Sequence, residues 1–100
     1  MSDAPISERS EDVHRALLLV KAELLEALNS YPPMATPHEG AAIIREEWDE
    51  LWDIVKVSKY ARVGYQPELI RKDLTLMRSE AIQIAAMAVR FVIDVCKVAR

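Results

Sequence analysis

The sequence predicts an all-α protein, built as an antiparallel bundle of three to four helices. Apolar residues make up 51% of its 100 residues, which is enough for one hydrophobic core. Only 2 residues are Gly, too few for a turn-rich β fold. The apolar residues also recur at steps of three and four over three long stretches, which is the period of an amphipathic α-helix.

The first helix is expected to begin at Glu11, with Ser10 as its N-cap, after a flexible lead-in over residues 1–9. A proline pair at 32–33 ends this stretch, because proline lacks the N–H group that a helix needs. Residues 10–100 are expected to form a single helical domain.

The second helix is expected to start near His38 or Glu39 and to end at about Ser58. One apolar stripe runs along it, and its other sides are mostly charged. We expect this stripe to face the core, with Trp48 in it. Its members are Ala41, Ile44, Trp48, Leu51 and Val55.

The third stretch is expected to be helical from Pro67 to about Val98, since proline is favourable at the first helical position. Ser79 could cap a separate final helix, so the sequence leaves one helix or two open. Arg90 and Asp94 stand four residues apart in an apolar segment and are expected to form an ion pair.

Charge and composition narrow the possible partners. Thirteen basic and 16 acidic residues give a net charge of −3, which argues against a nucleic acid polymer as ligand. No apolar run approaches the length of a membrane span and no signal-peptide core is seen, so we expect a soluble cytoplasmic protein. Three helices alone would leave much apolar surface in water, and a homodimer or tetramer is therefore expected.

Carboxylates cluster in the segment Glu46-Glu47-Trp48-Asp49-Glu50 of the second helix. At about 100° per residue, Glu47 and Glu50 lie some 60° apart, so their carboxylates can converge. Like charges so placed repel each other, and a divalent cation between them would remove this cost. Taken alone, the segment is more typical of a solvated helix face than of a metal site.

Glu80 and Gln83 stand at the start of the most apolar stretch of the chain. A glutamine there either hydrogen-bonds across the core or lines a polar pocket, since a buried amide needs a partner. If the second and third helices pack antiparallel, four residues can form a site with oxygen ligands only, which suits Mg²⁺ or Mn²⁺ and not Zn²⁺. These candidate metal ligands are Glu47, Glu50, Glu80 and Gln83.

The spacing Glu-Glu-x-x-Glu, followed about thirty residues later by Glu-x-x-(Asp), resembles the all-α nucleoside triphosphate pyrophosphohydrolases of the MazG-like group. Here the two motifs are residues 46–50 and 80–83, and the wider segments 38–52 and 80–91 resemble a small, compact subgroup. The resemblance implies Mg²⁺-dependent hydrolysis of a nucleoside triphosphate between its α and β phosphates, which gives a nucleoside monophosphate and pyrophosphate. The implied role is the removal of unwanted triphosphates from the nucleotide pool.

By position, Glu47, Glu50 and Glu80 match the metal ligands of the family, and Glu46 matches an acidic residue that holds a second ion or orients water. Glu46 or Glu50 is the candidate catalytic base. Gln83 departs from the pattern, since it stands where the family usually has aspartate. An amide oxygen still ligates a hard cation, but the site has one negative charge fewer.

A nucleotide-binding site needs cationic side chains to bind the phosphates and an aromatic side chain on which the nucleobase can stack. The candidate substrate-binding residues are His38, Trp52, Lys56, Lys59 and Arg62. His38 and the lysine and arginine side chains among them are more typical of ordinary surface positions than of a phosphate site. The alternative to an enzyme is a non-catalytic helical protein for oligomerisation or binding, which keeps the MazG-like fold while Gln83 marks a degenerate metal site.

Overall fold

The computed structural model describes residues 6–58 and 67–97, with side chains from residue 8 onward. Three α-helices make up most of it: α1 (Ile6–Ser30), α2 (Pro37–Val55) and α3 (Pro67–Phe91). A π-helical turn, η1 (Val92–Cys96), follows α3 directly. Within these described ranges no strand occurs, which confirms the all-α prediction.

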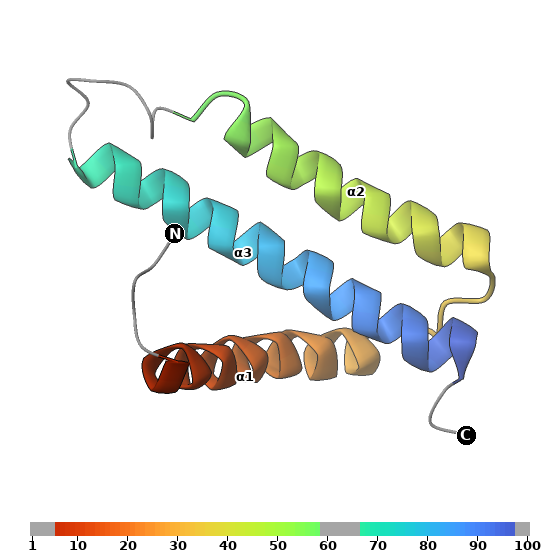
Figure 1. Cartoon of the computed structure of the whole chain (residues 1–100). Coiled ribbons are helices and arrows are strands. Elements are labelled where there is room, and N and C mark those ends of the chain that lie inside the picture. The colour runs from red at the N-terminus through yellow and green to blue at the C-terminus, as the bar shows by residue number, and fades with distance from the viewer. Residues whose placement is uncertain (1–5, 59–66, 98–100) are drawn as a thin grey trace.

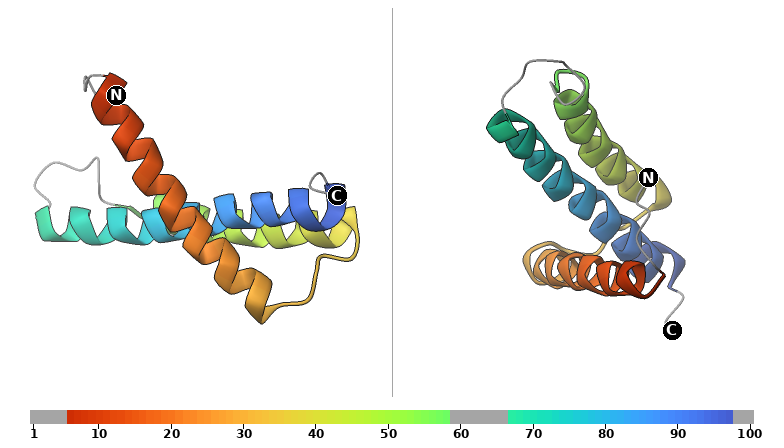
Figure 2. Two further views of the ribbon diagram at one scale, coloured as in Figure 1. Left: turned by 90° about the horizontal axis from the view of Figure 1, so that it is seen from below. Right: turned by 60° about the vertical axis from the view of Figure 1, so that its left-hand side comes forward.

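The middle helix of the array is α3 (Figure 1). It lies antiparallel and side by side with α2, whereas α1 crosses it at an angle on its other side (Figure 2). Both α1 and α2 pack on α3 and hardly touch each other. The result is an open array of 50 × 33 × 20 Å, in which part of α3 has no helix over it.

The helix starts follow local capping. Helix α1 begins at Ile6, so the expected start at Glu11 is wrong and Ser10 lies inside the helix. The negative charge of Glu8 in the first turn interacts favourably with the positive end of the helix dipole. The side chain of Thr36 caps α2 by accepting a hydrogen bond of 3.1 Å from the Glu39 N–H.

Helix α3 is continuous from Pro67 to Phe91, so Ser79 does not begin a separate helix and the stretch is one α-helix. It passes into η1 and ends at Lys97, whose φ of 55° is left-handed and stops the helix. Helix α2 ends at Val55, three residues before the expected Ser58.

The core is small and lies where the three helices approach one another. Its buried apolar members are Ala27, Met34, Ala86 and Met87. Gly40 is buried against Phe91: a Cβ at this position would lie 2.5 Å from a Phe91 ring carbon, so only glycine allows α2 to approach α3 this closely.

Arg90 and Asp94 tie the connection between α1 and α2 to the end of α3. Their predicted ion pair is confirmed, with 3.4 Å between Arg90 Nε and Asp94 Oδ2. Arg90 Nη2 donates a 2.7 Å hydrogen bond to the carbonyl of Pro32, and Asp94 Oδ2 accepts one of 2.9 Å from the N–H of Met34. The connection, and with it the start of α2, is thereby fixed beside α3.

Trp48 does not lie in the core, contrary to the sequence interpretation: 48% of it is exposed. The apolar stripe of α2 is divided, since Ile44 packs against the core whereas Trp48 and Val55 are exposed. On α1, Leu17 is 61% exposed. None of the helices in the described part of the chain is long and apolar enough to cross a membrane.

Candidate metal centre

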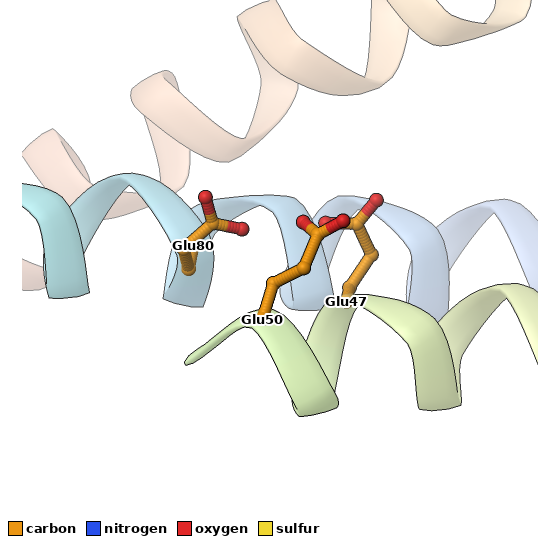
Figure 3. Close-up of side chains that lie close together, drawn as sticks. All are labelled: Glu47, Glu50 and Glu80. Atoms are coloured by element: carbon orange, nitrogen blue, oxygen red, sulfur yellow. The ribbon is translucent and has the colours of Figure 1, made fainter. Parts of the chain in front are cut away.

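Three glutamates converge where α2 and α3 run side by side: Glu47 and Glu50 from α2 and Glu80 from α3 (Figure 3). Each offers a carboxylate oxygen, and the three oxygens lie within 4.8 Å of one another. The antiparallel packing of the two helices produces this cluster, because Glu47 and Glu50 share one side of α2 and Glu80 lies on the side of α3 that faces α2. The predicted convergence of these three residues is therefore present.

The pKa values of two of the three carboxylates, Glu47 and Glu80, are raised. Partial burial, followed by the charge of Glu50 and a hydrogen bond with it, raises the pKa of Glu47 from 4.5 to about 7, and Glu80 and Glu46 add to this. Burial and the same two effects of Glu50 also raise the pKa of Glu80. Glu50 thus interacts with both Glu47 and Glu80. A cation bound between the carboxylates would relieve their mutual repulsion.

The donor set fits a hard divalent cation. Mg²⁺ takes six oxygen ligands at about 2.0–2.1 Å in an octahedron, so adjacent ligands stand about 2.9 Å apart and opposite ones about 4.2 Å apart. The three carboxylate oxygens lie within 4.8 Å of one another, so their side chains would rotate inward to bind one ion. Glu47 and Glu80 are half-buried, whereas Glu50 is exposed, which leaves the cluster open to solvent on one side.

A groove of about 690 Å³ opens beside the cluster, between α1 and α2 and over α3. Its walls carry five carboxylates, and Tyr31 and Arg90 also line it. The five are Glu23, Glu26, Glu39, Glu46 and Glu47. In the described part of the chain, Arg90 is the one cationic side chain in this lining, and it is only 4% exposed.

Two candidates from the sequence lie in the groove. Glu46 is exposed in its wall directly beside Glu47, and Gln83 lines it half-buried, three residues after Glu80. Within the described residues Gln83 makes no hydrogen bond, so it does not form the bond across the core that was the alternative to a polar pocket. Its amide is available to a ligand in the groove.

The substrate-binding candidates among the described residues lie outside the lining of this groove. Lys56 is paired with Asp53 at 2.8 Å near the end of α2, and Trp52 is half-exposed and outside the groove lining. His38 is exposed in the first turn of α2 and is also outside this lining. Lys59 and Arg62 fall outside the described residues.

Sequence reasoning missed the contribution of α1 to this groove. Glu23 and Glu26 stand three residues apart beside the apolar positions Val20, Leu24 and Ala27 that pack on the core. This spacing places both glutamates on one side of α1, and it is the sequence feature that could have indicated a shared acidic surface there. Which flank faces α2 depends on how α1 crosses α3, and helical periodicity does not contain that information.

Comparisons with protein-family models, with curated proteins and with solved structures found no match to this chain.

Proposed function

We propose that this protein is a Mg²⁺-dependent nucleoside triphosphate pyrophosphohydrolase of the MazG-like type, which releases a nucleoside monophosphate and pyrophosphate. The observation that carries the proposal is the cluster of Glu47, Glu50 and Glu80 at the edge of a groove between three helices. We further propose that it works as a homo-oligomer in the cytoplasm, where it removes unwanted triphosphates from the nucleotide pool.

In this proposal Glu47, Glu50 and Glu80 hold the Mg²⁺ ion, and the amide oxygen of Gln83 is a further ligand. Mn²⁺ has the same ligand preference and would serve in its place. When bound, the ion supplies positive charge against the triphosphate oxygens. The raised pKa values of Glu47 and Glu80 support this assignment, because carboxylates that repel one another at neutral pH bind a cation favourably.

Glu46 is the proposed catalytic base. It lies in the groove wall next to Glu47, with its carboxylate exposed to water. It accepts a proton from a water molecule that attacks the α-phosphorus, and the bond from that phosphorus to the bridging oxygen breaks with pyrophosphate as the leaving group. Glu50 is reserved for the metal because it interacts with both Glu47 and Glu80.

The groove is the proposed nucleotide-binding site. A volume of about 690 Å³ falls in the range of about 300–1,000 Å³ that is typical of small-molecule sites. Its acidic walls disfavour a free triphosphate and accept one that is accompanied by divalent cations. This charge pattern accounts for a nucleotide site with few basic side chains in its lining.

The test is product analysis with a panel of standard and modified nucleoside triphosphates in the presence of Mg²⁺, followed by ³¹P NMR. We expect pyrophosphate and monophosphate from the wild-type protein, no product from Glu50→Gln, and wild-type activity from Glu68→Gln. Glu68 is the control because it is an exposed glutamate in the first turn of α3, outside the cluster.

Release of inorganic phosphate instead of pyrophosphate would contradict the proposed bond cleavage. No product from any triphosphate would contradict the enzyme and favour the non-catalytic helical protein, with the glutamate cluster as a degenerate site.

A further inference from the structure

The groove extends along α3 well beyond the glutamate cluster. Gln83, Met87 and Arg90 of α3 line it, and their spacing of four and three residues places them on one side of the helix. At a rise of about 1.5 Å per residue, Arg90 lies about 15 Å along the helix axis from Glu80 of the cluster. The groove therefore has a second end, at Arg90, whose lining is separate from the candidate metal ligands.

All three helices contribute to this second end. Tyr31 follows α1 directly, and the Cζ atom of Arg90 lies 5.7 Å from the centre of its ring. Gly40 in the first turns of α2 contacts Phe91 at the end of α3. The end of α1, the start of α2 and the end of α3 thus lie together (Figure 1). Glu39 precedes Gly40 and lines the groove, so it lies at this end as well.

Tyr31 supplies an aromatic ring at this end of the groove. Among the described residues that line the groove it is the one aromatic side chain, and 63% of it is exposed. The Arg90 guanidinium lies over one face of the ring and is itself held by Asp94 and by the carbonyl of Pro32. The ring thus has a buried, fixed support on one face, and its exposure leaves the other face free to stack with a planar ring.

Glu39 supplies a hydrogen-bond acceptor at the same end. Its side chain is exposed in the groove lining and, within the described ranges, makes no ion pair or hydrogen bond. An ionised carboxylate accepts hydrogen bonds and donates none, so it selects a ligand edge that carries N–H groups. Guanine has two such groups side by side, N1–H and the 2-amino group, and both can donate to one carboxylate. Uracil and thymine have one N–H between two carbonyl oxygens, which a carboxylate repels.

We propose that this end of the groove is a guanine subsite, in which the ring of Tyr31 stacks on the base and Glu39 accepts hydrogen bonds from N1–H and the 2-amino group. The stretch of groove between Arg90 and Glu80 then takes the ribose and leads the phosphates to the glutamate cluster. The inference names guanine nucleoside triphosphates as the substrate class, and in that respect it rests on the proposed function. Trp52, the aromatic candidate from the sequence, lies outside this lining.

The test is binding of guanosine and inosine to the wild-type chain, measured by saturation-transfer difference NMR. The two nucleosides differ only in the 2-amino group, and neither carries a phosphate, so their binding requires neither a metal ion nor catalysis. We expect guanosine to bind about fivefold more tightly than inosine, because inosine donates one hydrogen bond to Glu39 where guanosine donates two. The strongest saturation transfer should be to the protons of the base.

Matched variants separate the two contacts. Glu39→Gln should abolish the preference for guanosine. Glu46→Gln is its control, since Glu46 lines the same groove on the same side of α2, about 10 Å further along the helix, and it should keep the preference. Tyr31→Leu should weaken both nucleosides about tenfold by removing the stacked ring, whereas Tyr31→Phe should bind them as the wild type does. Circular dichroism checks that each variant is folded.

Equal binding of guanosine and inosine by the wild type would overturn the inference, as would no binding of either at millimolar concentration. A preference for guanosine that survives in Glu39→Gln would also overturn it. Hydrolysis is scored separately: a chain that binds guanosine through Tyr31 and Glu39 but cleaves no triphosphate keeps the subsite and loses the proposed function. A chain that cleaves GTP, ITP and UTP with the same kcat/KM keeps the proposed function and loses the subsite.

Discussion

Arg90 and Asp94 form an ion pair in the interior of the protein, with 3.4 Å between Arg90 Nε and Asp94 Oδ2 and with both side chains only 5% exposed. The pair connects η1 and the end of α3 to the backbone of Pro32 and Met34. Since α2 starts three residues after Met34, this pair sets where α2 meets α3 and where Glu47 and Glu50 meet Glu80.

Arg90→Ala is expected to lower the free energy of unfolding by about 3 kcal/mol or more, because the carboxylate of Asp94 would stay buried without its cation. Urea denaturation measures this. The control is Arg45→Ala, which removes an exposed pair with Asp49 and should cost less than about 1 kcal/mol. Equal losses for the two variants would show that the buried pair does not organise the connection.

Gly40→Ala is expected to destabilise the protein by about 1–3 kcal/mol, because the new methyl group would overpack the contact between α2 and α3. Its Cβ would lie 2.5 Å from Phe91 Cδ2 and 3.1 Å from Met34 Sδ. Combining it with Phe91→Leu should cost less than the sum of the two single changes, as measured by thermal unfolding. A purely additive double variant would contradict the close contact.

The stability of the metal-free protein should depend on pH through Glu47. Its pKa is about 7 in the folded protein against 4.5 as the ordinary value, so folding favours the protonated form. The contribution of Glu47 to stability is complete below pH 4.5 and is lost as the pH rises through about 7.

We therefore expect the difference in Tm between Glu47→Gln and wild type, measured in EDTA, to shift in favour of the variant across this pH range. Adding Mg²⁺ should raise the wild-type Tm more at the alkaline end of the range than at the acid end, since the ion binds the deprotonated carboxylates. Parallel Tm curves for the two proteins, with and without Mg²⁺, would contradict the mutual repulsion of the cluster.

Gln83→Asp should tighten divalent cation binding by about tenfold, equivalent to about 1.4 kcal/mol, because it adds a negative charge beside the existing three. Gln83→Leu should weaken binding by removing the amide oxygen. Both are measured by Mn²⁺ titration. Unchanged affinity in both variants would mean that Gln83 lines the groove without ligating the ion.

The sequence predicted those features that depend on helical periodicity and short spacing. The convergence of Glu47 and Glu50, the pairing of Arg90 with Asp94 and the helical character of the described chain all follow from residues three or four positions apart. The long-range meeting with Glu80 followed from one further assumption, the antiparallel packing of α2 and α3.

The sequence did not predict which apolar side of a helix meets which neighbour. Only part of the predicted apolar stripe of α2 meets the core: Ile44 packs against it, whereas Trp48 is exposed. Helix α2 approaches α3 most closely at Gly40. The inclusion of Glu23 in the groove likewise depends on the crossing of α1 over α3. These relationships depend on helix packing between distant segments, and periodicity does not specify them.

The central claim is that Glu47, Glu50 and Glu80 form one divalent cation site, and Mn²⁺ titration followed by the EPR signal of the free ion tests it most directly. The account predicts one Mn²⁺ bound per chain by the wild type and by Glu68→Gln, displacement by excess Mg²⁺, and loss of binding in Glu50→Gln. Equal Mn²⁺ binding by the wild type and Glu50→Gln, or no binding by either, would contradict it.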